Sequence, residues 1–139
     1  MIDNFLENAP SNPASGEIFM LISPHAGYGF SGQTAAYGYK LIKGKPYKTV
    51  IILGASHHKP FTGAAVYAQG AFETSLGRLK IDEEFTKNLL GKGPDIFADE
   101  SVFSGEHSVE VQLPFLQKVL PNFSAEGGPA CGGKIVQKA

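Results

Sequence analysis

The sequence has few of the residues that build disulfide frameworks or membrane spans. It contains one cysteine, Cys131, and no tryptophan. A single cysteine cannot form an intramolecular disulfide, which indicates a reducing compartment. The opening residues, MIDNFLENAP, lack the basic segment and apolar stretch of a secretory signal, and no apolar run approaches the ~20 residues that span a bilayer. We therefore expect a cytoplasmic protein with no membrane partner.

An excess of charge of one sign is also absent. The chain has 12 Lys and Arg residues against 13 Asp and Glu residues, a formal net charge of −1, and the two signs are mixed along it. Without a basic patch, nucleic acid is not an expected partner. With 139 residues, of which 42% are hydrophobic, the chain is long enough for one hydrophobic core.

Two short apolar runs dominate the first half of the chain. Residues 18–22 and 49–53 are continuously apolar and predict strands buried on both faces. Between them, apolar residues recur at helical spacing over 31–42, and Lys-Gly-Lys-Pro follows as a helix exit. Strand, helix and strand in this order predict a βαβ unit with parallel strands, and so an α/β fold.

The second half of the chain predicts shorter elements. Residues 64–68 and 77–81 are typical of strands, and residues 82–90 of a helix with Asp82 as its N-cap and Gly91 at its end. Apolar residues at helical spacing over 106–120 predict a further helix. Because Pro114 interrupts this pattern, the helix is either kinked or begins near Leu113 with the proline in its first turn.

Each predicted strand is followed by a histidine. His25 comes three residues after the first apolar run and His57 four residues after the second. The carboxyl ends of neighbouring parallel strands lie about 5 Å apart at one sheet edge, so both imidazoles are expected to reach one metal ion. A third protein ligand is needed. The candidates are His107, Glu106, Glu110 and Cys131.

Two other site classes were weighed against a metal centre. Residues 27–32, GYGFSG, match the G-x-G-x-x-G pattern of dinucleotide sites, but no Asp or Glu occurs between Glu17 and Glu73 to bind a ribose. Ser56 and His57 are a candidate nucleophile and base, but neighbours in sequence usually point apart, and no carboxylate is paired with them by spacing. Both classes are disfavoured.

Three segments, PHAGYGFSG, LGASHH and EHSVEVQLPFLQ, together resemble the Memo family, whose bacterial and archaeal members are called AmmeMemoRadiSam system protein B. The resemblance covers residues 1–123. It implies a three-layer α/β fold with a mostly parallel central sheet, similar to class III extradiol dioxygenases, which hold non-haem iron with two histidines and a carboxylate.

The resemblance also implies roles for individual residues. His25 and His57 match the family's metal-site histidines, His107 matches the histidine of its E-H-S motif and is the catalytic candidate, and Cys131 is the candidate for the family's metal-site cysteine. The expected cofactor is a divalent ion, with iron, copper and zinc left open. A metal-dependent, dioxygenase-like oxidoreductase follows as the leading function.

The chain departs from the Memo pattern in its second part. The family is longer and carries an S-S-D-x-x-H segment that is absent here. Residues 1–123 are therefore expected to be an incomplete Memo-like domain, and residues 124–139 a glycine-rich tail that is disordered or outside the family frame. An incomplete sheet would expose an edge or an apolar face, through which the chain would associate.

Two alternatives to an enzyme stay open at this point. One is a non-catalytic module that binds a peptide or small molecule against Tyr28, Phe30 and His58. The other is a truncated fragment with no function of its own.

Overall fold

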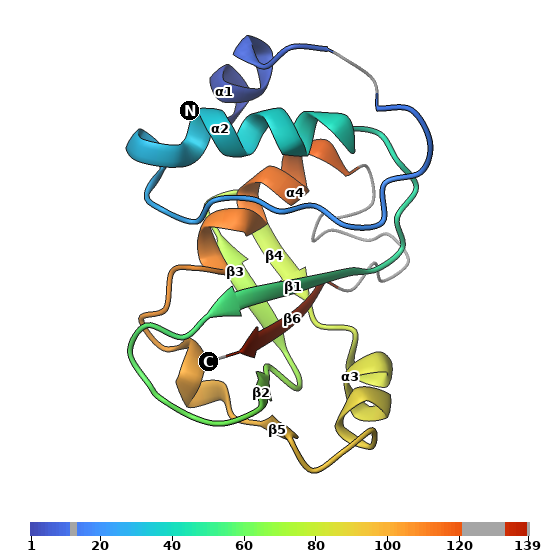
Figure 1. The fold of residues 1–139 in the computed structure, drawn as a ribbon, viewed down its shortest axis with the longest axis vertical. Helices are drawn as coiled ribbons and strands as arrows, with labels where there is room; N and C mark the ends of the chain where they lie inside the picture. Colours follow the sequence, from blue (N-terminus) through green and yellow to red (C-terminus); the bar gives the residue numbers. More distant parts are fainter. Residues whose placement is uncertain (12–13, 121–132, 139) are drawn as a thin grey trace.

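The structure is a computed structural model that describes residues 1–11, 14–120 and 133–138. Three helices pack together at one end of the molecule: α1 (Ile2–Asn8), α2 (Tyr28–Leu41) and α4 (Leu113–Val119). The strands lie below them, and α3 (Glu83–Leu90) lies at the opposite end (Figure 1).

The main sheet has four strands in the order β1-β6-β2-β5. Strand β1 (Val50–Ala55) pairs in parallel with β6 (Gly133–Lys138), and β2 (Ala64–Val66) pairs in parallel with β5 (Ile96–Ala98). The two pairs join through an antiparallel contact between β2 and β6. This sheet is mixed, so the described residues form a mixed α/β fold with small sheets.

Strands β3 (Ala71–Thr74) and β4 (Gly77–Lys80) form a separate antiparallel hairpin. Gly77, the first residue of β4 after the turn, has a φ of 115°, a conformation that residues other than glycine rarely adopt. Two 3₁₀ helices complete the described elements: η1 (Glu100–Phe103) and η2 (Glu110–Gln112).

The hydrophobic core lies between the three packed helices and one face of β1. Its members are Tyr39 and a set of buried apolar side chains. Burial of each large apolar side chain stabilises the fold by about 1.5–3 kcal/mol. They are Ile2, Leu6, Ala9, Ala35, Ala36, Tyr39, Ile42, Ile52, Leu79, Val109, Leu113, Phe115, Leu116, Val119 and Leu120.

Glycines in α2 let neighbouring segments approach its backbone. A Cβ at Gly32 would lie 2.5 Å from Cε2 of Phe5 in α1, and a Cβ at Gly38 would lie 2.7 Å from Cδ1 of Leu21. Gly32 is the last glycine of the G-x-G-x-x-G pattern. In the structure it allows α1 to pack closely against α2. Part of the glycine pattern is thus explained without a dinucleotide.

The first predicted strand is not present. Residues 18–22 have no regular secondary structure, and Phe19, Met20 and Ile22 are largely exposed. A strand needs a hydrogen-bonded neighbour, whereas this segment lies across a cavity from β1, whose described partner is β6. The predicted βαβ unit is therefore wrong in its first strand, and the three-layer arrangement around a mostly parallel sheet is not confirmed.

Several other predicted elements are confirmed. Helix α3 begins after Asp82, whose Oδ1 accepts the Phe85 N–H at 3.0 Å, and Gly91 is its C-cap. Helix α4 begins at Leu113 with the proline in its first turn, which decides between the two alternatives. The predicted helix at 31–42 begins earlier, at Tyr28, because the Gly27 carbonyl accepts the first helical N–H groups.

The glycine-rich tail lies mostly outside the described residues. Residues 133–138 of it form β6, whose two neighbouring strands, β1 and β2, provide its hydrogen-bond partners. No helix in the described ranges is long and apolar enough to cross a bilayer.

We expect Gly32→Ala to lower the free energy of unfolding by about 1–3 kcal/mol, because the added methyl would overlap the Phe5 ring. Gly29→Ala is the matched control in the same helix, where a Cβ meets nothing within 4 Å. That change should stabilise the chain by up to about 1 kcal/mol through helix propensity. Urea titration measures both, and equal effects would contradict the packing role of Gly32.

Candidate metal centre

Three of the four histidines meet at one end of β1. The ring centroid of His57 lies 5.2 Å from that of His25 and 5.0 Å from that of His107, and His25 and His107 are 6.1 Å apart. His57 follows β1, His25 precedes α2, and His107 lies between the two 3₁₀ helices. The predicted proximity of His25 and His57 is present, although His25 reaches the site from an irregular segment and not from a strand.

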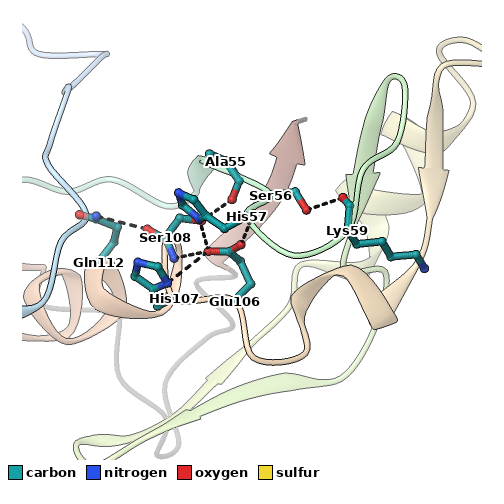
Figure 2. A network of polar contacts seen from close by, with 8 residues as sticks. All are labelled: Ala55, Ser56, His57, Lys59, Glu106, His107, Ser108 and Gln112. Carbon is teal, nitrogen blue, oxygen red and sulfur yellow. Dashed lines mark hydrogen bonds and ion pairs between the residues drawn. The ribbon is translucent and has the colours of Figure 1, made fainter.

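A buried carboxylate, Glu106, lies behind His57 and His107 (Figure 2). Its side chain is only 1% exposed. Oε2 accepts the backbone N–H of His57 at 2.7 Å, and Oε1 accepts the backbone N–H of Ser108 at 2.8 Å. Oε1 also lies 2.9 Å from Nδ1 of His57 and 3.7 Å from Nδ1 of His107.

These contacts keep Glu106 ionised. Burial by itself would raise the pKa of the carboxyl, because it disfavours the charged form. Glu106 accepts hydrogen bonds from the backbone N–H groups and the side chains of His57 and Ser108. These hydrogen bonds outweigh the effect of burial and hold the pKa of Glu106 well below its usual range. The site therefore contains a fixed negative charge beside its imidazoles.

The segment that carries Glu106 also fixes the two loops that carry His25 and His57. The Ser108 hydroxyl donates to the Ala55 carbonyl at 2.8 Å, and the Gln112 amide donates to the Pro24 carbonyl at 3.2 Å. Tyr39 donates to the Gln112 side-chain oxygen at 2.6 Å, which sets the orientation of that amide. Residues 106–112 thus fix the positions of the loops that carry His25 and His57 relative to each other.

Gly54 allows this contact. A Cβ at Gly54 would lie 2.6 Å from the Ser108 hydroxyl and 2.7 Å from Cγ2 of Val109, both of which are buried. The glycine of the LGASHH stretch is therefore needed for close approach of β1 to residues 106–109. Ser108 and Gln112 were not predicted from the sequence, although their spacing of four residues within EHSVEVQ is that of one helix face.

His57, Glu106 and His107 have ligand atoms that all lie within 4.8 Å of one another, and so could hold a metal ion. Two imidazoles that bind one ion at ~2.0–2.1 Å place their ring centres about 5 Å apart, which matches the spacing of His57 to both other rings. The donor set fits a divalent transition metal.

The remaining candidates lie in different surroundings. Tyr28 is half-buried and donates to the Val111 carbonyl at 3.2 Å, Phe30 is 93% exposed, and His58 and Glu110 are exposed. Cys131 lies outside the described residues. The Ser56 hydroxyl donates to the Lys59 carbonyl at 2.7 Å, which makes it part of a turn and gives no support to a serine nucleophile.

An apolar cavity of about 580 Å³ opens beside His25. Its walls come from the segment 18–23 and from residues 49–53, which include the first part of β1. The sides of α2 and α4 that face the core complete them. Polar groups of Ser23, His25, Ser108 and Gln112 line it on the histidine side. The volume is typical of small-molecule sites, with an apolar lining and a few polar groups.

The chain is similar to known proteins over most of its length. A family model described as Memo-like protein matches residues 1–125. A MEMO1 family protein of Caldivirga maquilingensis is 41% identical over 108 residues, which cover 75% of this chain and 37% of that protein. A MEMO1 family protein of Methanopyrus kandleri is 45% identical over 101 residues, covering 71% of this chain and 35% of that protein. Protein memo-1 homolog of Caenorhabditis elegans is 37% identical over 119 residues, which cover 86% of this chain and 33% of that protein. The chain thus spans about a third of the length of these relatives.

We expect the metal-free chain to lose stability as the pH falls below about 4.5, the carboxyl pKa of an unfolded chain. The folded-state pKa of Glu106 is lowered, so its ionised form stabilises the fold above that pH, and this stabilisation disappears as the pH drops toward the folded-state value. Urea unfolding with a chelator present, from neutral to acidic pH, measures the change.

Glu106→Gln supplies the comparison for this titration. It should be less stable than the wild type by about 2–3 kcal/mol at neutral pH, because it loses charge-assisted hydrogen bonds, and the difference should shrink on acidification. Glu110→Gln, which removes an exposed carboxylate four residues away, should change little. A difference between wild type and Glu106→Gln that does not vary with pH would contradict the account.

Proposed function

The chain belongs to the Memo family, and on that premise we propose that its histidine cluster binds one divalent transition-metal ion. The observation that carries the proposal is the meeting of His25, His57 and His107 with ring centroids 5.0–6.1 Å apart. A protein of this length brings three loop imidazoles together at a cost, because each must give up solvation and side-chain freedom. An ion bound by all three would offset that cost.

The donor types narrow the choice of ion. Neutral imidazole suits zinc, copper and iron, whereas magnesium and calcium prefer oxygen ligands. We propose that His25, His57 and His107 hold the ion, with Glu106 providing the compensating charge. Cys131, a candidate for the third ligand and for the family's metal-site cysteine, stays a prediction.

The proposed reaction class is a metal-dependent oxidoreduction of a small organic molecule, as the likeness to dioxygenases suggests. A bound iron or copper ion would supply the redox chemistry. The chain's own residues would admit and orient the substrate. The side chains of His57 and His107 are 38% and 47% exposed, so the cluster is open to solvent on one side. The apolar cavity beside His25 would hold the organic part of the molecule.

Elemental analysis of tag-free protein tests the metal site. After reconstitution with Zn²⁺ or Cu²⁺ and desalting, we expect about one ion per chain in the wild type and less than about a tenth of that in the His25→Ala, His57→Ala double variant, because two of three ligands are lost. His107→Ala alone should also lose most of its metal.

His58→Ala is the matched control, since it removes an exposed neighbouring histidine that the proposed site does not use. It should retain the wild-type metal content. Equal metal in the wild type and the double variant would refute the proposed site.

A non-catalytic ligand-binding module is the second candidate, and the apolar cavity favours it. Leu53 lines the cavity and is 71% exposed, whereas Leu76 is 41% exposed and lies outside it. We expect Leu53→Gln to reduce the fluorescence of a bound anilinonaphthalene sulfonate probe at least about twofold, because apolar contact area is lost, and Leu76→Gln to leave it unchanged. Equal signals would show that the dye binds elsewhere.

A further inference from the structure

Both oxygens of the Glu106 carboxylate are engaged inside the protein. Two backbone N–H groups, those of His57 and Ser108, donate to Oε2 and Oε1 at 2.7 and 2.8 Å. The ring of His57 approaches Oε1 as a third partner at 2.9 Å. With a side chain that is 1% exposed, this carboxylate has little room for an additional partner.

The imidazoles face Glu106 with the same ring atom. Nδ1 of His57 and Nδ1 of His107 are the nitrogens nearest to Oε1, at 2.9 and 3.7 Å. Figure 2 shows the second nitrogen of each ring on the side away from the carboxylate. The side of these two rings that faces away from Glu106 therefore presents their Nε2 atoms.

We propose that Glu106 is a positioning residue and not a metal ligand: it accepts the Nδ1–H of His57, fixes that tautomer and turns Nε2 of His57 toward the ion. The proposal rests on the metal site put forward above. Metal-binding histidines generally donate their second ring N–H to a carboxylate or carbonyl, which fixes the ring and raises its basicity. The contacts of Glu106 with His57 have this form.

The alternative is that Glu106 binds the ion itself, since one of its oxygens lies within 4.8 Å of nitrogens from both histidines. An ion at Oε1 would compete with the Ser108 N–H and with the His57 ring for the same oxygen. His25 is not among the described partners of Glu106, and its ring centroid lies 5.2 Å from that of His57 and 6.1 Å from that of His107. His25 is not among the residues whose ligand atoms lie within 4.8 Å of one another, so its ring would have to move closer for three imidazoles to surround one ion, with the carboxylate beside them.

Nitrogen-15 NMR of the histidine rings tests the proposal without any metal. In the chelator-treated wild type, above the pH at which the rings are protonated, we expect His57 to carry its proton on Nδ1. His58 is an internal reference, because a solvent-exposed neutral imidazole favours the Nε2–H tautomer. In Glu106→Gln, His57 should shift toward the tautomer mixture of His58. A wild-type His57 protonated on Nε2, or a tautomer that is unchanged in the variant, would overturn the proposal.

Copper binding gives the second readout. We expect Glu106→Gln to bind Cu²⁺ about 10–100-fold more weakly in chelator competition, the usual effect of losing an orienting carboxylate. The g and hyperfine values of the bound Cu²⁺ should stay those of the wild type, because the ligands are the same. Altered values would make Glu106 a ligand and overturn the proposal.

The two arms separate this inference from the proposed function. If the wild type binds no Cu²⁺ or Zn²⁺, the metal site itself fails, whatever the tautomer. If the wild type binds metal and His57 does not carry Nδ1–H, only the role of Glu106 fails. The wild-type NMR measurement needs no variant, so a Glu106→Gln chain that does not fold would still leave the proposal decided.

Discussion

The hydrogen bonds between the buried Glu106 carboxylate and His57 are the interaction on which the rest of the site depends. A buried charge is costly unless it is paired and fully hydrogen-bonded. Glu106 meets that condition only when the backbone and ring of His57 lie against it and the Ser108 N–H points back to it. The contacts that complete the hydrogen bonding of the Glu106 carboxylate therefore also fix the position of the His57 imidazole.

The surrounding packing serves that arrangement. Ser108 and Gln112 connect residues 106–112 to the Ala55 carbonyl after β1 and to the Pro24 carbonyl beside His25. Gly54 allows the two backbones to approach, because any side chain there would meet Ser108. The apolar side chains of α4 then anchor the segment in the core. A site made of loop residues thus acquires the rigidity that ligand binding requires.

Sequence patterns predicted the locally determined features and missed those that depend on partners. The cap at Asp82 and the start of α4 at Leu113, with Pro114 in its first turn, follow from local chemistry, and both are confirmed. The segment 18–22 is apolar enough for a strand, but a strand also requires a hydrogen-bonded neighbour, which periodicity cannot supply. His25 and His57 do lie close together, but not at the ends of two adjacent parallel strands, as their positions in the sequence predicted. The contacts of Glu106 with His57 were not predictable, because pairing with a residue 49 positions away leaves no mark on local spacing.

The most direct measurement of the central claim is X-ray absorption spectroscopy of the zinc-loaded chain. The account predicts a first shell of nitrogen atoms at ~2.0–2.1 Å, with the outer-shell scattering that imidazole rings produce. A first shell of oxygen atoms without imidazole scattering would contradict it, since the ion would then be held by surface carboxylates or water and not by the three histidines.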